Sequence, residues 1–380
     1  MRKIERIETV ILDIPTIRGH VLSMTTMVMQ SIVLVTARFS DGSVGLGEGA
    51  TIGGMSYGPE SPESIKTAID AYIAPLLKGR DADDVNGAIG LVEKAVRGNP
   101  IARCAVEIAL WDGLARRLGV SIAQLFGGPV RTSMPVAWTL ASGRSETDIA
   151  EAEEMIATRR HNVFKLKIGK RPLREDLAHV AAITRAVGDR ASVRVDVNQA
   201  WSLSDARSGL AGLQAIGVEL AEQPIRIGSL AALRSLTERY EIAVMADEQL
   251  QGPADAMAVA AARAADVFAV KIGQSGGLKR AAEVVAIGAA AGVGIYGGTM
   301  LEAGVSTAAA VQLFSTVEHL DWGTELFGPL LLKDEILAEP ILYRDFGVHL
   351  PEGPGIGVTL DPGKVDFYRR DRVRTLHAVS

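Results

Sequence analysis

The 380-residue sequence contains little of what several protein classes require. Cys104 is the only cysteine, so the chain cannot form an internal disulfide, which fits a reducing compartment. Aromatic residues make up 5% of the chain, and the formal net charge is −5 with no long basic run. This balance of charge argues against nucleic acid or an anionic membrane as the main partner.

Long apolar stretches are also missing. The longest weakly polar stretch, Val284 to Gly298, is shorter than the ~20 residues that a membrane-spanning helix needs. Acidic residues interrupt the first part of the chain, which lacks the apolar segment of a secretion signal. We therefore expect a cytoplasmic protein that does not bind membranes.

The order of the segments divides the chain into three parts. Residues 1–130 begin with β-rich runs and continue with helical periodicity, which predicts an α+β domain. Residues 131–340 alternate short apolar runs with helical stretches, and residues 341–380 return to mixed character. The strands and helices expected in the first part are Ile7–Asp13, Ser31–Phe39, Val44–Glu48, Ser64–Leu77 and Ala102–Leu118.

The second part, residues 131–340, contains eight apolar runs, and most of them are separated by helical stretches. Alternating strands and helices form parallel βα units, and eight in succession favour a (β/α)8 barrel over an open sheet. The eight expected strands are Val136–Leu140, Val163–Ile168, Val193–Val197, Val218–Gln223, Ala243–Glu248, Val267–Ile272, Val293–Tyr296 and Trp322–Phe327.

Carboxylates end three consecutive runs, where the active-site rim of a barrel lies. Asp196, Glu222 and Asp247 should therefore be neighbours, and bare carboxylates that close repel one another. A hard divalent cation relieves this repulsion, and all-oxygen ligation suits Mg²⁺ or Mn²⁺. The six histidines are scattered and form no zinc-binding pattern. One such acid alone would be better explained as a cap or ion-pair partner, but three in succession favour a metal site.

Lysines end other runs of the same series. Lys165 and Lys167 are two residues apart on an expected strand, so both side chains point to one face. Two adjacent ammonium groups lower each other's pKa, which would bring one toward the range of a general base. Lys271 belongs to the sixth run, across the barrel, so a substrate held at the metal would have a lysine on either face. A lone strand lysine is usually a packed or paired residue.

The metal and the lysines together indicate a reaction class. A proton beside a carboxylate is too weakly acidic for a lysine to remove unaided. A divalent metal on that carboxylate stabilises the enolate that forms. A lysine base combined with Mg²⁺ is the pattern of enolase-superfamily sites. We therefore expect an enzyme that forms and consumes an enolate.

Several sequence segments, taken in order, carry a more specific signal. They are TIGGMSYGPESPE at 51–63, AWTLASG at 137–143, RRHNVFKLKIG at 159–169, SVRVDVNQAW at 192–201, EQP at 222–224, MADE at 245–248, YGGTMLE at 296–302, WGTELFGPLLL at 322–332 and YRDF at 343–346. Through this ordered set the chain resembles the muconate lactonizing enzyme (muconate cycloisomerase) subgroup of the enolase superfamily, over essentially its whole length. The resemblance implies an α/β fold, a modified, TIM-like (β/α)7β barrel with an N-terminal α+β capping domain. It also implies that the C-terminal segment returns to the cap.

The resemblance also implies roles for individual residues. Lys167 corresponds to the acid/base and Lys165 to a lysine that assists it electrostatically. The metal ligands correspond to Asp196, Glu222 and Asp247, the further catalytic residues to Lys271 and Glu325, and the ligand-orienting positions to Asn198 and Glu248. The expected substrate-binding residues are His20, Ile52, Tyr57, Thr299 and Phe327, with specificity loops near Arg18–Met24 and Thr51–Tyr57. For His20, a substrate contact and a structural role in the loop are equally consistent with the sequence.

The reaction implied by the resemblance is the reversible lactonization of cis,cis-muconate to muconolactone in aromatic degradation. Gln249 and the segment Ile272–Ser275 depart from the relatives, so the exact substrate stays open. The alternatives are a chloromuconate cycloisomerase, an N-acylamino acid racemase, a dipeptide epimerase or an o-succinylbenzoate synthase. A barrel that only binds a ligand is disfavoured because every expected metal ligand and base is present. The expected partners are a small dicarboxylate, Mn²⁺ or Mg²⁺, and further copies of the chain in a homo-oligomer, octameric by the resemblance.

Overall fold

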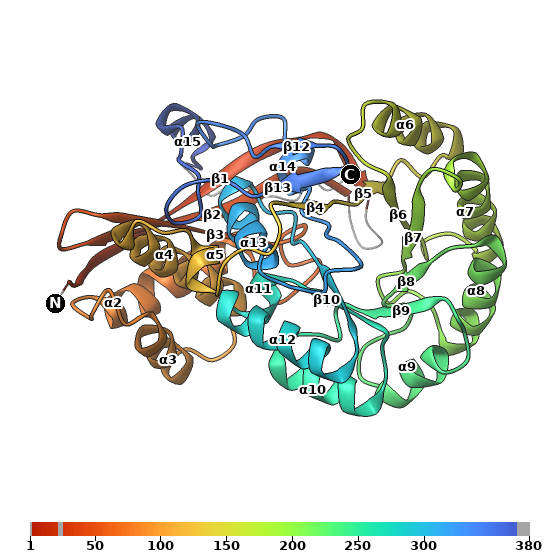
Figure 1. Ribbon diagram of the computed structural model, residues 1–380, viewed down its shortest axis with the longest axis horizontal. Coiled ribbons are helices and arrows are strands. Elements are labelled where there is room, and N and C mark those ends of the chain that lie inside the picture. Colours follow the sequence, from red (N-terminus) through yellow and green to blue (C-terminus); the bar gives the residue numbers. More distant parts are fainter. Residues whose placement is uncertain (1, 22–25, 371–380) are drawn as a thin grey trace.

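The N-terminal part of the molecule is an antiparallel sheet covered by helices (Figure 1). The computed structural model describes residues 2–21 and 26–370, and its first sheet has the order β1-β2-β3. These strands span Ile4–Val21, Thr26–Phe39 and Val44–Ala50, and contain the three expected β-rich runs. The prediction of an α+β first part is confirmed.

The helices of this part pack on one face of the sheet. They are α1 (Pro62–Ala68), the π-helical turn η1 (Ile69–Ile73), α2 (Ala74–Leu77), α3 (Val85–Ala95), α4 (Pro100–Leu118) and α5 (Ile122–Leu125). Helix α4 crosses β3 closely because Gly45 and Gly47 lack side chains. A Cβ atom on either glycine would lie 1.9 Å from a carbonyl oxygen of α4. The two glycines thus serve helix packing.

The second part is a curled sheet of seven parallel strands in the order β11-β10-β9-β8-β7-β6-β5, with helices outside it (Figure 1). Strands β5 to β11 span Trp138–Leu140, Val163–Lys167, Ser192–Asp196, Leu220–Glu222, Ala243–Ala246, Val267–Val270 and Gly294–Gly297. Helices α6 to α13 span Ser145–Ala157, Leu173–Val187, Leu203–Ile216, Leu230–Thr237, Pro253–Ala262, Ile272–Ser275, Leu278–Ala291 and Gly304–Phe314.

The eighth expected strand, Trp322–Phe327, is not a strand, so this part of the prediction was wrong. Only Thr324 forms β-bridges, one to Val136 before β5 and one to Gly297 at the end of β11. The extended backbone is short. It begins after Gly323, which has a positive φ of 68°, and it ends before helix α14 (Gly328–Leu331). The segment still fills the gap between β5 and β11, as expected for a modified barrel.

The C-terminal segment contacts both parts of the molecule. Strands β12 (Tyr343–Arg344) and β13 (Gly347–His349) form a small sheet with β4 (Ser133–Pro135). Further on, α15 (Pro362–Tyr368) lies near β1, and the Arg370 guanidinium donates to Asp13 with an Nε–Oδ2 distance of 2.7 Å. The division at residues 1–130, 131–340 and 341–380 stays a prediction, but the return to the cap is visible.

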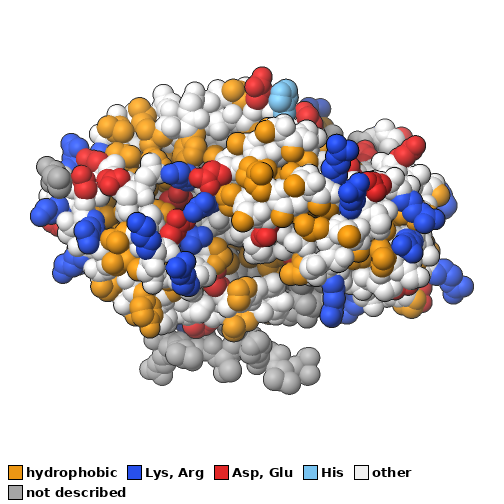
Figure 2. All heavy atoms as spheres, turned by 90° about the horizontal axis from the view of Figure 1, so that it is seen from below, with side chains coloured by type: hydrophobic (Ala, Val, Ile, Leu, Met, Phe, Trp, Pro, Cys, Tyr) orange, Lys and Arg blue, Asp and Glu red, His pale blue; other side chains and the backbone are white. Residues whose placement is uncertain are grey.

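Helix α13 is buried along its whole length, because it lies between the barrel and the N-terminal part. Cys104 is a free cysteine buried in α4. None of the helices in residues 2–21 and 26–370 is both long and apolar enough to cross a membrane. On the face shown in Figure 2, basic and acidic side chains are interspersed, with apolar side chains between them.

Candidate active site

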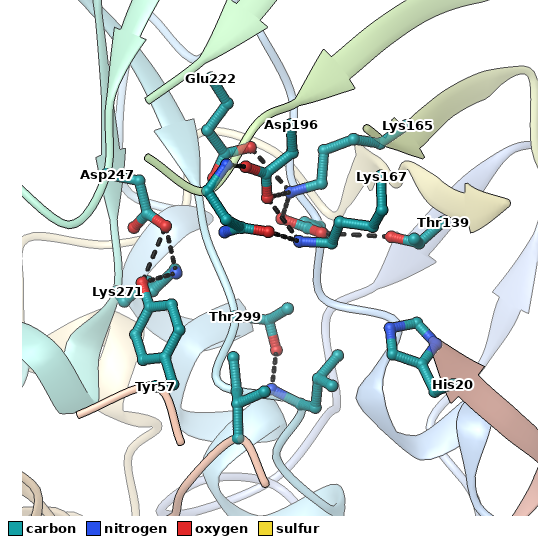
Figure 3. Close-up of a pocket in the computed structure, with 14 residues that line it drawn as sticks. His20, Tyr57, Thr139, Lys165, Lys167, Asp196, Glu222, Asp247, Lys271 and Thr299 are labelled. Atoms are coloured by element: carbon teal, nitrogen blue, oxygen red, sulfur yellow. Dashed lines mark hydrogen bonds and ion pairs between the residues drawn. The ribbon is translucent and has the colours of Figure 1, made fainter. Parts of the chain in front are cut away.

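A pocket lies at the carboxyl ends of the barrel strands, and His20 and Tyr57 of the N-terminal part line its other side (Figure 3). The open space inside it is only about 20 Å³, so the side chains themselves fill most of the site. Its walls are formed by His20, Ile52, Tyr57, Thr139, Lys165, Lys167, Asp196, Asn198, Glu222, Asp247, Lys271, Thr299, Leu301 and Glu325. Most of the residues predicted from strand ends and motifs therefore meet in one place.

Strand register brings the charged side chains together. Lys167 on β6 is paired with Asp196 on β7, which is paired in turn with Glu222 on β8. Because the strands are parallel, all three residues lie at the same end of the sheet. Lys165 and Lys167 point to the same face of β6, as their spacing predicts.

The backbone turns sharply where these strands end. Asn198, Gln223 and Leu301 each have a positive φ, at 45°, 35° and 59°. A residue other than glycine in this region costs roughly 1–3 kcal/mol and persists only where its surroundings hold it. The Gln223 side chain accepts the Asp247 N–H at 3.0 Å, and Asn198 Oδ1 lies 3.3 Å from Lys167 Nζ. The strained turns thus fix two strand ends and their charged residues.

Lys165 is enclosed by carboxylates. Its Nζ atom lies 2.5 Å from Glu325 Oε2, 2.8 Å from Glu222 Oε2 and 3.8 Å from Asp196 Oδ2. Burial disfavours the charged lysine, but Glu222 and Glu325 outweigh burial and raise the pKa of Lys165 well above its usual value. The sequence had predicted mutual lowering within the lysine pair, and for Lys165 this direction was wrong, because the carboxylates lie closer than expected.

Lys271 forms a second charged group on the opposite side of the pocket (Figure 3). Its Nζ atom donates to Asp247 Oδ2 at 2.8 Å and to the Tyr57 hydroxyl at 2.7 Å. The Tyr57 hydroxyl in turn donates to Asp247 Oδ2 at 2.8 Å. Gly298 leaves the space that Lys271 needs, since a Cβ atom there would lie 2.7 Å from Lys271 Cγ. The two lysines thus approach the pocket from different sides.

The acids of the pocket have the chemistry of a site for a hard divalent cation. Burial, followed by the charge of Asp196, raises the pKa of Glu222 well above its usual value. Asp247 Oδ1 and Glu248 Oε2 are buried oxygens without a hydrogen-bond partner among the described residues. Within residues 2–21 and 26–370, no three His, Cys, Asp or Glu side chains are grouped closely enough to hold a metal ion, and lysine ammonium groups lie against Asp196, Glu222 and Asp247. Carboxylate oxygens are the ligands that Mg²⁺ and Mn²⁺ prefer, so the acids of the pocket fit either ion.

The cap contributes a neutral histidine to the pocket. His20 is 1% exposed, and its Nδ1 atom has no hydrogen-bond partner among the described residues. Burial, with Lys167 and Arg18 nearby, lowers the pKa of His20 to about 3, so the ring is uncharged at neutral pH. Phe327, predicted to bind substrate, is buried and its ring centre lies 6.5 Å from that of His20.

Two further predicted features are Glu248, expected to orient a metal ligand, and the first of the two expected loops. Glu248 lies behind the pocket wall and accepts from Asn198 Nδ2 at 3.2 Å. The first expected loop, Arg18–Met24, is strand β1 up to Val21, and residues 22–24 lie outside the described residues.

Two wall residues were missed by the sequence reasoning. Thr139 donates to Glu325 Oε1 at 3.4 Å, and Leu301 lies beside Thr299. Both belong to the motifs AWTLASG and YGGTMLE, which were the available signal.

The barrel, the cap and the acids and lysines at the strand ends together define an enolase-type protein. A family model, "Mandelate racemase / muconate lactonizing enzyme, N-terminal domain", matches residues 6–127. A second model, "Enolase C-terminal domain-like", matches residues 147–364. The chain belongs to the mandelate racemase / muconate lactonizing enzyme family of the enolase superfamily.

Individual relatives extend this comparison. The chain is 57% identical over 369 residues to muconate cycloisomerase 1-2 of Acinetobacter lwoffii, covering 97% of this chain and 96% of the relative. It is 48% identical to chloromuconate cycloisomerase of Delftia acidovorans, covering 97% and 99%. A solved structure of muconate lactonizing enzyme from Pseudomonas fluorescens, complexed with muconolactone, superposes with a TM-score of 0.96 at 50% identity, covering 97% of this chain and 99% of that one.

Proposed function

We propose that this protein is a muconate cycloisomerase, an isomerase that interconverts cis,cis-muconate and muconolactone. The observation that carries the proposal is the 57% identity to a muconate cycloisomerase along 97% of the chain. The pocket supports it, because a dicarboxylate needs positive charge and the site presents three lysines. A chloromuconate cycloisomerase is the second candidate, supported by the relative at 48% identity.

The reaction sets the task of the lysines. One carboxylate oxygen of muconate forms a bond to a carbon of the far double bond. The electrons of that double bond move toward the other carboxylate and give an enolate there. Lys167, as an ammonium, donates one proton to the enolate carbon, which turns the dianion into the monoanion muconolactone. In reverse, neutral Lys167 removes that proton.

The surrounding residues assist this proton transfer. Lys165 and Lys271 place positive charge on two sides of the reacting carboxylate, and Glu325 holds Lys165 in position through their 2.5 Å contact. Asp196, Glu222 and Asp247 would hold Mn²⁺ or Mg²⁺, with Asn198 and Glu248 orienting them. Such a metal, when bound, stabilises negative charge as it develops on the substrate carboxylate. His20, Ile52, Tyr57, Thr299 and Phe327 would shape the pocket around the substrate.

The broader organisation is part of the same proposal. Residues 1–130 and 341–380 cover a barrel of residues 131–340, and the enzyme acts in the cytoplasm as a homo-oligomer, octameric by resemblance to its family.

Ultraviolet absorbance of cis,cis-muconate tests the activity directly. Enzyme with Mn²⁺ should remove the conjugated-diene absorbance and yield muconolactone, and a chelator should stop the reaction. Folded, metal-loaded enzyme that leaves the diene intact would exclude muconate as the substrate, and chloromuconate would be tried next.

A further inference from the structure

The end of strand β1 carries His20 into the pocket but is poorly held by its own sheet. Between the pairs Pro15–Met29 and His20–Met27, four residues of β1 oppose one residue of β2. Regular pairing is therefore interrupted just before His20. Only the pairs His20–Met27 and Val21–Thr26 follow the interruption, so contacts outside the β1–β2 ladder help to fix where His20 lies.

Arg18 lies in the irregular stretch just before His20 and binds residues of the barrel. Its Nη2 atom donates to the carbonyl oxygen of Thr139 at 3.1 Å and to Glu151 Oε1 at 2.9 Å. Its guanidinium carbon lies 5.9 Å from the centre of the Trp138 ring. Arg18 and His20 are two residues apart on β1, so both side chains face the barrel. Arg18 binds Thr139 and Glu151, and His20 lines the pocket.

Glu151 lies on the barrel side of this contact, on helix α6, and is not part of the pocket wall. The oxygen that receives Arg18 also accepts the Trp138 indole N–H at 2.8 Å. One carboxylate oxygen therefore joins the cap strand β1 to the barrel strand β5. Both side chains of the ion pair are largely shielded, with 26% and 18% exposure, which strengthens the contact relative to a surface pair.

The joined residues are direct neighbours of the pocket. Thr139 follows Trp138 on β5, lines the pocket and donates to Glu325. The Trp138 ring packs edge-on against Phe327, with 5.0 Å between the ring centres, and Phe327 adjoins His20. A shift of Trp138 or Arg18 would therefore change the width of the pocket between His20 and Thr139.

We infer that Glu151 is a positioning residue that sets substrate fit, by fastening the His20 strand of the cap to the first strand of the barrel. The inference rests on the proposed cycloisomerase activity, for which it names a residue that governs how tightly a dicarboxylate is held. Glu151 touches neither substrate nor reacting atoms, so its loss affects binding more than proton transfer.

The test compares Glu151→Ala with Glu151→Gln and with a matched control, Glu153→Ala. Glu153 lies on the same helix and forms an exposed ion pair with Arg190, at 2.7 Å. For Glu151→Ala, the KM for muconate should rise about fivefold to tenfold with kcat within about twofold, as expected for one lost charge-assisted contact. The glutamine keeps an acceptor oxygen and should restore the KM, and Glu153→Ala should resemble the parent enzyme.

A second measurement needs no turnover. Hydrogen exchange of the backbone amides of residues 16–21 should be at least about tenfold faster in Glu151→Ala than in Glu153→Ala. In the Arg18→Ala/Glu151→Ala double variant, the increase in exchange rate should be smaller than the two single effects combined, because both single variants remove the shared Arg18–Glu151 contact.

Equal amide exchange rates in Glu151→Ala and Glu153→Ala would overturn the inference. A fall in kcat without a rise in KM in Glu151→Ala would overturn it as well. An unmodified enzyme that does not consume muconate would instead refute the proposed function, while the exchange comparison would still decide the role of Glu151.

Discussion

Two sets of buried acids in this molecule are neutralised in different ways. The seam glutamates, Glu48 and Glu107, reach from the cap to the first turns of the barrel helices α13 and α12. Glu48 accepts the N–H groups of Ala303 and Ser306 at 2.6 and 3.0 Å, and Glu107 accepts that of Lys279 at 3.4 Å. The mouth carboxylates, Asp196, Glu222 and Asp247, lie against lysine side chains instead.

The hydrogen-bond partners of each set of acids, backbone amides or lysine ammonium groups, explain what that set can do. A backbone amide at a helix N-terminus is fixed, so a carboxylate bonded to it has one arrangement and joins two parts of the fold. A lysine ammonium group stands on a flexible stem and can exchange its place with another cation or with substrate. Acids of similar burial are therefore suited to joining the fold at the seam and, under the proposed function, to chemistry at the mouth.

The strongest test of this contrast removes the proposed acid/base. Lys167→Ala should lower turnover of muconate by about a thousandfold or more, since a positioned acid or base contributes 10²–10⁴. Absorbance of the diene measures the rate, and circular dichroism checks that the variant folds. Lys170→Ala, an exposed lysine three residues away, is the matched control. Turnover that survives in Lys167→Ala would remove this lysine from the mechanism.

The seam should respond in stability and not in chemistry. Glu48→Ala leaves two buried N–H groups of α13 without an acceptor, which should cost about 2–4 kcal/mol of unfolding free energy. Glu48→Gln retains one acceptor oxygen and should cost less. Urea denaturation measures both, with Glu238→Ala as a control that breaks only an exposed pair with Arg234. A Glu48→Ala loss no larger than that of the control would show that the seam is not held by this carboxylate.

A metal-binding measurement separates the two sets of acids directly. Glu222→Gln should weaken Mn²⁺ binding by at least about tenfold to a hundredfold, the loss typical even of residues that only orient metal ligands. Glu107→Gln, an equally buried glutamate at the seam, should bind Mn²⁺ as the parent does. Titration calorimetry of each protein without substrate gives the dissociation constants. Equal affinities in the two variants would contradict the assignment of Glu222 as a ligand.

The sequence predicts the mouth far better than the seam. Lys167, Asp196, Glu222 and Asp247 follow apolar runs, and parallel strands bring such ends to one edge. The last expected strand failed because its β-bridges to both neighbours are confined to Thr324, a closure that depends on distant partners.

The seam and the Glu151 contact have no comparable signal. Glu48 follows an apolar run like any strand-end acid, and its partners lie more than two hundred and fifty residues away. Glu151 looks like a solvated helix residue, and only the packing of β1 against α6 and β5 gives it partners. The raised pKa of Lys165 was missed for the same reason, because it depends on how closely Glu222 and Glu325 approach.

The smallest effect expected is a pH dependence of stability that originates at the seam. Burial is the main cause that raises the pKa of Glu48 to about 8 and that of Glu107 to about 7. Both values lie above the ordinary glutamate value near 4.5, so the folded protein binds protons more tightly than the unfolded chain. The stability from these protons is fully present below about pH 4.5 and is lost as the pH rises through about 7 and then 8. Between pH 6 and pH 9 the unfolding free energy should therefore fall by roughly 1–3 kcal/mol. The double variant Glu48→Gln/Glu107→Gln is neutral at both positions, so its urea midpoint should change less over this range. A parent protein whose stability is flat or rises from pH 6 to pH 9, relative to the double variant, would show that the seam glutamates are already ionised at neutral pH.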